Sequence, residues 1–426
     1  MAATETHRAI EAVWRIESAR LIAGLTRSVR DVGLAEELAQ EALVAALEAW
    51  PEAGVPDNPG AWLMVTAKRR AIDELRRREL LARKHEELGR ESAVRGEAMA
   101  PDPDAAIDDD IGDDLLRLLF TSCHPVLPTE GRVALTLRLL GGLTTDEIAR
   151  AFVVPEATVA QRIVRAKRTL ASAGVPFEVP RGPERDARLA SVLQVIYLVF
   201  NEGYSATAGD DWMRPGLCED ALRLGRILAE LAPGEPEVHG LVALMEIQAS
   251  RMGARVGPAG EPVLLLDQNR GRWDRILIGR GLAALARAQA ITGPDARVAW
   301  GPYALQAAIA ACHARAPTAA DTDWARIAGL YEILGRVAPS PVVELNRAVA
   351  VSMALGPAAG LAVVDGLCAV GALEGYHLLP SVRGDLLARL GRHEEARVEM
   401  ERAAGLTRNA REREMLLARA AGLPRG

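Results

Sequence analysis

Apolar residues recur with helical spacing along nearly the whole chain, and this pattern predicts an all-α fold. We expect two small helical domains, at residues 1–80 and 113–173. Residues 81–112 are predicted to form an acidic, extended linker, because prolines and like charges keep a backbone open. A boundary rich in glycine and proline at residues 174–183 precedes a large C-terminal helical segment, residues 184–426.

The most specific motif, residues 143–170, predicts a helix-turn-helix. Thr145 is expected to cap a short helix that ends at Phe152, and Val153-Val-Pro to form the turn. On the second helix the predicted buried stripe consists of Val159, Ile163, Ala166 and Leu170. The alternative to a DNA-binding role is a basic helix that is merely solvated.

The opposite face of this second helix is predicted to enter a major groove. It carries Thr158, Gln161, Arg162, Arg165 and Arg168. Arginine pairs with guanine and glutamine with adenine, and the other basic groups suit phosphates. Lys167 lies near the apolar edge, so we expect it to contact phosphate or solvent.

A second basic helix is predicted at residues 59–78. Six cations fall within eleven positions, namely Lys68, Arg69, Arg70, Arg76, Arg77 and Arg78. Such density favours a polyanion as partner. Trp62, Val65 and Ile72 form the predicted apolar stripe, so Trp62 is expected in the core rather than as a platform for bases. Arg69 projects from within that stripe.

A third helix, residues 34–50, combines acids with apolar side chains away from its core face. Its predicted buried residues are Leu34, Leu38, Ala42, Ala45 and Ala49. The other face mixes Glu36, Glu37, Gln40 and Glu41 with Leu43, Val44 and Leu47. Apolar groups among acids suggest a docking surface for a protein. The alternative is a solvated face.

Small residues near the C-terminus suggest helical repeats. Gly384, Gly391, Ala396 and Ala403 follow one another at offsets of 7, 5 and 7, the spacing of one tetratricopeptide unit. Gly356 precedes Gly391 by 35 residues, close to the period of that repeat, which is about 34. Two or three degenerate repeats are predicted, and the alternative is an Ala-rich helical bundle.

Composition narrows the function classes. Lys plus Arg number 51 and Asp plus Glu 57, a net charge of −6, which argues against a protein that coats nucleic acid over its whole surface. No apolar run approaches the ~18 to 20 residues that span a bilayer, and the first residues lack the pattern of a secretory signal, so we expect a cytoplasmic protein. The four cysteines are scattered without C-x-x-C spacing, which argues against a disulfide framework.

Catalytic chemistry finds little support in the sequence. No P-loop, G-x-S-x-G or H-E-x-x-H occurs. The pairs Cys123-His124 and Cys312-His313 are far from the short spacings of zinc modules. We therefore expect no enzyme activity, no catalytic residues, no metal and no cofactor.

Several strings together resemble the extracytoplasmic-function (ECF) sigma factors of RNA polymerase. Residues 31–42, Asn58-Pro-Gly-Ala-Trp-Leu and Ala71-Ile-Asp-Glu-Leu-Arg-Arg resemble their region 2, and residues 127–170 resemble their region 4. The long tail is similar to the subgroup with a C-terminal tetratricopeptide-type extension. Residues 197–204 and 264–270 resemble landmarks of that extension.

The resemblance implies a sigma factor that binds core RNA polymerase and directs promoter-specific initiation, regulated by its own C-terminal helical domain. Its implied partners are the polymerase β′ clamp helices and β flap, promoter DNA, and a regulatory protein or an intramolecular contact of the tail. Two rival functions remain open at this point. One is a helix-turn-helix regulator that works without polymerase, and the other is a tetratricopeptide-type adaptor.

The resemblance also implies a role for each helix. The clamp helices would be met by Glu36, Glu37, Gln40, Glu41 and Val44. The −10 promoter element would be met by Lys68, Arg69, Arg70, Asp73, Arg76 and Arg77, and the −35 element by the face of Thr158 to Arg168. The chain departs from the family's usual Ala-Arg-Asn-Arg-Ala-Ile-Asp run at Arg69, which replaces the asparagine.

Overall fold

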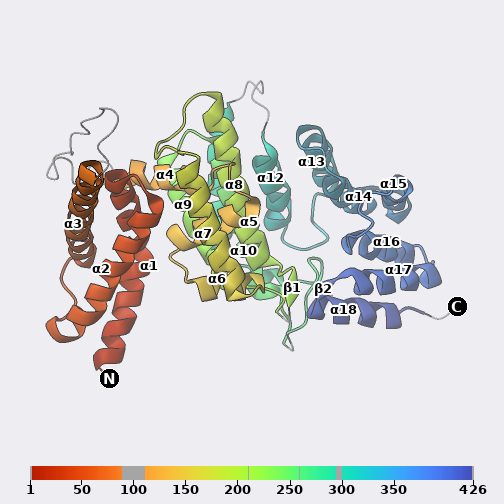
Figure 1. The fold of residues 1–426 in the computed structure, drawn as a ribbon. Coiled ribbons are helices and arrows are strands. Elements are labelled where there is room, and N and C mark those ends of the chain that lie inside the picture. Colours follow the sequence, from red (N-terminus) through yellow and green to blue (C-terminus); the bar gives the residue numbers. More distant parts are fainter. Residues whose placement is uncertain (1, 89–110, 210, 259, 294–299, 425–426) are drawn as a thin grey trace. The chain divides into compact units, whose positions relative to one another are not determined.

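The computed structural model of the chain describes residues 2–88, 111–209, 211–258, 260–293 and 300–424 (Figure 1). Nearly all regular structure in these ranges is α-helical, which confirms the predicted all-α fold. Residues 1–150 and 154–195 form one compact unit, and residues 151–153 and 196–426 form a second. Within the described ranges, no helix is both long and apolar enough to cross a membrane.

The first unit is organised around its N-terminal helix. Its helices are α1 (Ala2–Val29), α2 (Val32–Ala53), α3 (Pro59–Leu88), α4 (Ile111–Ser122), α5 (Thr129–Leu139), most of α6 (Thr145–Phe152), α7 (Glu156–Ser172) and the first part of α8 (Pro183–Tyr204). Helix α1 packs against α2, α3, α4 and α5, and α5 packs against α7. Leu21, Ile22 and Leu25 of α1 are almost fully buried and form part of this core.

Side-chain caps begin the second and third helices. The Asp31 carboxylate accepts a hydrogen bond from the Leu34 amide at 3.0 Å, and the Asn58 side chain accepts one from the Ala61 amide at 3.0 Å. Helix α3 then continues to Leu88, beyond the predicted start of the linker at residue 81. The acidic run of that linker, within residues 89–110, lies outside the described residues.

The second unit is a succession of helices in which chain neighbours pack against one another. After the end of α8 come α9 (Pro215–Leu231), α10 (Pro236–Ala249), α11 (Arg275–Thr292), α12 (Pro302–Arg315), α13 (Trp324–Val337), α14 (Pro341–Leu355), α15 (Pro357–Ala369), α16 (Leu378–Arg389), α17 (His393–Leu406) and α18 (Ala410–Ala421). Two short 3-10 helices, η1 (Met252–Ala254) and η2 (Arg270–Arg272), lie between α10 and α11. Figure 1 shows the pairs α14/α15 and α16/α17 in blue tones.

Small residues lie where α16 and α17 meet, as the spacing predicted. A methyl group added to Gly384 would lie 3.1 Å from the Ala396 carbonyl oxygen, so only hydrogen fits there comfortably. Ala396 and Ala403 are fully buried, and Gly391 adopts φ +77° in the turn between the helices. The close antiparallel pair is therefore confirmed, whereas its assignment as a tetratricopeptide unit stays a prediction.

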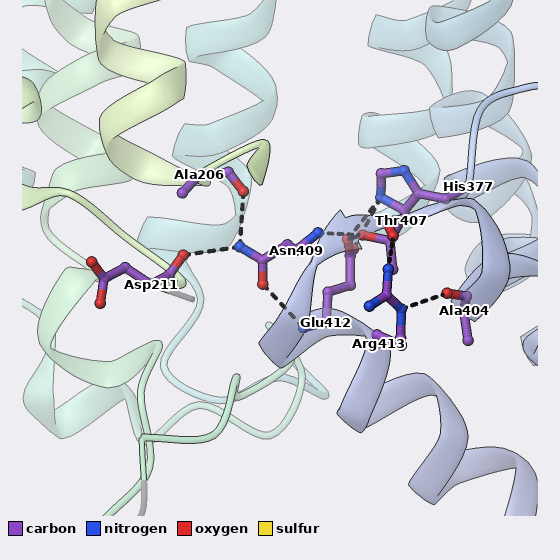
Figure 2. A network of polar contacts seen from close by, with 8 residues as sticks. All are labelled: Ala206, Asp211, His377, Ala404, Thr407, Asn409, Glu412 and Arg413. Atoms are coloured by element: carbon purple, nitrogen blue, oxygen red, sulfur yellow. Dashed lines mark hydrogen bonds and ion pairs between the residues drawn. The ribbon is translucent and has the colours of Figure 1, made fainter. Parts of the chain in front are cut away.

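A polar clamp joins the beginning and the end of the second unit. Strand β1 (Ala208–Gly209) pairs in parallel with β2 (Arg408–Asn409). Figure 2 shows the Asn409 side chain of β2 reaching the residues on either side of β1: its amide donates to the carbonyl oxygens of Ala206 at 3.1 Å and Asp211 at 2.9 Å. Asn409 and Ala206 are 203 positions apart in the sequence and are joined by a hydrogen bond. Helical periodicity could not predict this contact.

Candidate nucleic-acid interface

Helix α6, the three-residue turn and α7 form the predicted helix-turn-helix. The prediction of Thr145 as the cap was wrong by one residue. Thr144 accepts a hydrogen bond from the Glu147 amide at 3.1 Å, and the Glu147 carboxylate accepts one from the Thr144 amide at 2.8 Å. This reciprocal pair is a capping box. Val153 in the turn has φ +50°, a strained conformation for a β-branched residue.

The carboxylate of this capping box is held in its ionised form. Partial burial raises the pKa of Glu147, but hydrogen bonds from Thr144 and the nearby charge of Arg15 outweigh it, so the pKa is lowered overall. The Arg15 guanidinium, on α1, lies 3.3 Å from the Glu147 carboxylate. The start of the helix-turn-helix therefore contacts the N-terminal helix of the same unit.

Helix α7 separates its two faces as predicted. The buried stripe is Val159, Ile163, Ala166 and Leu170. On the opposite side Gln161, Arg165 and Arg168 are exposed, while Thr158 and Arg162 are half-buried. Among the described residues, no carboxylate makes an ion pair with any of these arginines, so their donors face solvent or a ligand.

A shallow groove of about 340 Å³ lies beside this arginine face. It is lined by Arg162, Arg165, Ala166 and Thr169 of α7 and by Pro128, Glu130 and Gly131 at the start of α5. Arg162 and Arg165 bring positive charge to this groove, and Glu130 brings a negative one.

The core face of α3 differs from the prediction. Leu63, Ala67 and Ala71 are buried, whereas Val65 is 49% exposed and Ile72 only half-buried. Two small alanines allow α3 to approach its neighbours closely, and this packing outweighs the larger apolar side chains of the expected stripe.

Trp62 therefore lies at the edge of this core, and Arg69 lies outside it. The Trp62 ring is half-buried and makes an edge contact with Trp50, with 5.3 Å between ring centroids. Arg69 is exposed and does not project from a buried stripe. Trp62 and Arg69 are about two helical turns apart on α3, and a ring and a guanidinium on one helix can both contact unpaired bases.

Ion pairs divide the basic residues of α3 into two groups. Arg70 pairs with Glu41 of α2 at 2.8 Å, and Arg77 and Arg78 each pair with Glu74 at 3.0 Å. The second group has no ion pair among the described residues: Lys68, Arg69 and Arg76. Asp73 is exposed on the same helix.

The core face of α2 also departs from the prediction. Ala39, Ala46 and Trp50 are buried in addition to Leu34, Leu38 and Ala42. Ala45 is only half-buried and Ala49 is exposed, so the stripe is rotated from the expected one. The polar face keeps Glu37, Glu41 and Val44 exposed and Gln40 half-buried.

Glu36 was expected on the docking face, and this expectation was wrong. It is 4% exposed, and its carboxylate lies 2.7 Å from the Arg138 guanidinium and 2.5 Å from the Lys167 ammonium. Gln40 also donates to it at 2.7 Å. A buried carboxylate requires such partners, because desolvation of an unpaired charge is costly. The expectation that Lys167 contacts phosphate or solvent is corrected with it.

Part of the predicted polymerase and −10 sets lines one groove of about 360 Å³, namely Glu37 and Glu41 from the first and Arg70, Asp73 and Arg77 from the second. It is lined by Leu34, Glu37, Leu38 and Glu41 of α2 and by Arg70, Asp73, Glu74, Arg77 and Arg78 of α3. Both acidic and basic side chains line this groove. Such a mixed lining suits contact with a macromolecule better than binding of a single small ion. Within the described residues, no group of three or more His, Cys, Asp or Glu side chains could hold a metal.

Three family models match the chain. Residues 16–80 match Sigma-70 region 2, residues 117–170 match Sigma-70 region 4, and residues 188–289 match DUF6596, a family of unknown function. The two sigma models cover α1 to α3 and α4 to α7, the helices that carry the surfaces described above.

Relatives extend this result. The uncharacterized protein R00370 of Rhizobium meliloti (strain 1021) is 46% identical over 91% of this chain and 89% of its own length. The ECF RNA polymerase sigma factor SigK of Mycobacterium tuberculosis (strain H37Rv) is 32% identical over 34% of this chain and 74% of its own length. No solved structure matches the chain. With regions 2 and 4 both present and SigK matched over most of its length, the chain belongs to the ECF RNA polymerase sigma factors and directs transcription initiation.

Proposed function

We propose that this sigma factor reads the −35 element with α7, the −10 element with α3, and binds core RNA polymerase through the exposed edge of α2. The arrangement of α7 carries the proposal. Val159, Ile163, Ala166 and Leu170 are buried in one stripe, and Gln161, Arg165 and Arg168 are exposed on the other side. Among the residues that the structure describes, no acid pairs with either arginine. A helix of this kind presents fork-shaped donors to a major groove.

The −10 assignment rests on the outer side of α3. Lys68, Arg69 and Arg76 have no ion pair among the described residues, so their charge is available to a nucleic acid. Trp62 lies half-buried on the same helix and offers a ring for stacking. Arg70 and Arg77 already pair with acids, and their use on DNA requires exchange of those partners.

The polymerase assignment rests on the exposed part of α2. Glu37 and Glu41 flank the groove with α3, and Val44 is 50% exposed one turn further on. An acidic edge with an apolar neighbour is suited to a basic helical surface such as the clamp helices of β′.

The contacts of Glu36 support a closed free form of the first unit. Arg138 and Lys167 belong to region 4, and Glu36 belongs to region 2, so this ion pair joins the two promoter-reading regions directly. Both regions must reach separate promoter elements in the initiating complex. Polymerase binding is therefore proposed to separate them, at the cost of this contact.

The second unit is proposed to regulate the first, by an intramolecular contact or by docking a partner protein. Successive helix pairs such as α14/α15 and α16/α17 expose extended surfaces that bind proteins. Binding to core polymerase also implies that the chain acts in the cytoplasm, where transcription takes place.

Glu37→Lys tests the polymerase surface, and Glu48→Lys on the same helix is its matched control. Both residues are exposed, so neither change should disturb the core. We expect Glu37→Lys to weaken co-elution with core polymerase and to reduce run-off transcription, while Glu48→Lys does neither. Equal behaviour of the two variants contradicts the α2 assignment. Specific duplex binding by the pure chain with no effect on transcription supports the polymerase-independent alternative.

A further inference from the structure

Three arginines of the second unit surround shared aromatic rings. Arg251 follows α10, Arg255 follows η1, and Arg270 begins η2. The Arg255 guanidinium carbon lies 3.7 Å from the centroid of the Tyr204 ring, and that of Arg251 lies 5.8 Å from it. Arg251 and Arg270 lie 5.9 Å and 4.8 Å from the Trp273 ring. These shared rings bring three positive charges together, and we call Arg251, Arg255 and Arg270 the arginine cluster.

The arginine cluster is withdrawn from solvent. Arg251 is 9% exposed and Arg270 is 7% exposed. Burial lowers the pKa of both Arg255 and Arg270. A guanidinium nevertheless stays protonated at neutral pH, so the three charges are desolvated without being lost.

No counter-charge accompanies this burial. Among the described residues, no carboxylate makes an ion pair with Arg251 or Arg255. Within the described ranges, Arg270 donates to three neutral groups, the carbonyl oxygens of His313 and Ala316 and the Thr322 hydroxyl. The stabilisation from cation–π contacts is smaller than the free-energy penalty of desolvating a guanidinium. The part of the chain that the structure describes therefore supplies no anion that pairs with the cluster.

Neither of two neighbouring titratable residues, Asp321 and His313, balances the charge of the arginine cluster. Asp321, whose charge acts on Arg270, is exposed, and its carboxylate accepts hydrogen bonds from Thr318. Burial and the charges of Arg251 and Arg270 lower the pKa of His313 to about 4. Its ring is thus neutral at pH 7 and neither adds to the positive charge nor balances it.

Unused hydrogen-bonding atoms gather at the same place. The Nε atoms of all three arginines are buried without a hydrogen-bond partner. So are the indole nitrogens of Trp212 and Trp273, and Trp212 lies 5.5 Å from the Arg255 guanidinium carbon. All five of these nitrogens are donors. A buried set of unpaired donors around three positive charges is complementary to an oxyanion.

We propose that the arginine cluster binds the phosphate group of a small ligand. Guanidinium groups pair in bidentate fashion with phosphate oxygens, and indole N–H groups supply further donors. A phosphate dianion balances three positive charges better than a carboxylate does. Binding at this site does not depend on the regulatory role proposed for the second unit, and that role can fail while the site stands.

The experiment titrates the full-length chain with inorganic phosphate at pH 7.5 and constant ionic strength. Thermal unfolding and tryptophan fluorescence are both recorded, because Trp212 and Trp273 border the cluster. We expect a saturable rise in Tm and a saturable fluorescence change with phosphate, and neither with sodium chloride or acetate. Phenyl phosphate and inorganic phosphate are compared directly: tighter binding of the former indicates a phosphomonoester ligand, and equal binding indicates free phosphate.

Three variants locate the binding. Arg251→Gln and Arg255→Gln should weaken phosphate binding about 30-fold or more, because each removes a buried charge partner. Arg272→Gln, at an exposed arginine in η2, should keep the full response. An unmodified chain that responds to phosphate no more than to chloride, or equally to acetate and phosphate, overturns the proposal and leaves the cluster as a structural cation–π core. The fluorescence titration of the unmodified chain decides this even if a variant does not fold.

Discussion

Lys167 of α7 lies 2.5 Å from the carboxylate of Glu36 in α2, so the helix that is proposed to read the −35 element is tied to the helix proposed to bind polymerase. Arg138 of α5 completes the contact at 2.7 Å. The side chains of both cations are only 22% exposed, so solvent screens the interaction less than it would at the surface. This buried ion pair therefore stabilises the contact between region 2 and region 4 in the free chain.

Glu36→Gln should lower the free energy of unfolding by about 1–3 kcal/mol, because two partly buried cations lose their counter-charge. Urea unfolding followed by circular dichroism measures it. The neighbouring exposed change, Glu37→Gln, should stay within about 0.5 kcal/mol of the parent. Adding Lys167→Gln to Glu36→Gln should cost less than the sum of the single changes, because both remove the same contact. Additive losses would show that Glu36 and Lys167 do not stabilise each other.

Arg165→Ala should weaken binding to the cognate −35 duplex by about 1–3 kcal/mol and relax preference at one base pair, if the side chain reads a base. A phosphate contact instead weakens all sequences alike and lowers the salt dependence by about one charge. Fluorescence anisotropy over a series of single base-pair substitutions separates the two. Arg336→Ala, at an exposed arginine of α13, is the matched control. Unchanged affinity for every duplex would refute the assignment of this face.

The two helices proposed to meet DNA show why sequence reasoning succeeded in one case and failed in the other. In α7 the buried positions are mostly large and apolar, and the arginines lie off that stripe, so periodicity alone places the faces even though Val164 is 47% exposed. In α3 the buried positions include Ala67 and Ala71, whereas Val65 is exposed. Hydropathy favours burial of the larger valine, but close packing between helices favours burial of the smaller alanines. An argument from periodicity alone does not include this effect of side-chain size.

Glu36 illustrates a second limit. Its partner Arg138 is 102 positions away in the chain, and no local pattern connects the two. One signal was present: Glu36 stands between Ala35 and Ala39, both of which are fully buried. A carboxylate next to the core stripe of a helix predicts a cationic partner, although the partner's identity requires the fold.

His313 should make stability fall with decreasing pH. Burial and the charges of Arg251 and Arg270 lower its folded-state pKa to about 4, from 6.5 for an ordinary histidine. Between these values the unfolded chain binds more protons, so the contribution is complete above pH 6.5 and lost as pH falls toward 4. The expected loss between pH 7 and pH 5 is about 2 kcal/mol.

The matching measurement compares urea unfolding at pH 7 and pH 5, followed by tryptophan fluorescence, since the Trp324 ring lies 5.1 Å from the His313 ring. His313→Gln should remove about 2 kcal/mol of the pH dependence. His7→Gln, at an exposed histidine, should leave it unchanged. The same pH dependence in the parent and in His313→Gln would mean that the imidazole is not buried in neutral form.

Asn409→Ala should release the clamp that joins the two ends of the second unit. The Asn409 side chain is 1% exposed and donates to the carbonyl oxygens of Ala206 and Asp211, while its own oxygen accepts the Glu412 amide at 3.2 Å as the cap of α18 (Figure 2). Alanine leaves two carbonyls and one amide without partners. The free energy of unfolding of the second unit should fall by about 2–4 kcal/mol.

Two comparisons with Asn409→Ala make the outcome specific to the clamp. Asn346→Ala, at an exposed asparagine of α14, should change stability by less than about 0.5 kcal/mol. Asn409→Asp keeps the capping oxygen but brings a carboxylate against two carbonyl oxygens, so it should destabilise more than alanine does. Hydrogen exchange should show faster exchange around β1 and the start of α18 in both Asn409 variants. If aspartate is tolerated better than alanine, the donor role of the amide is wrong and only the cap of α18 stabilises this region.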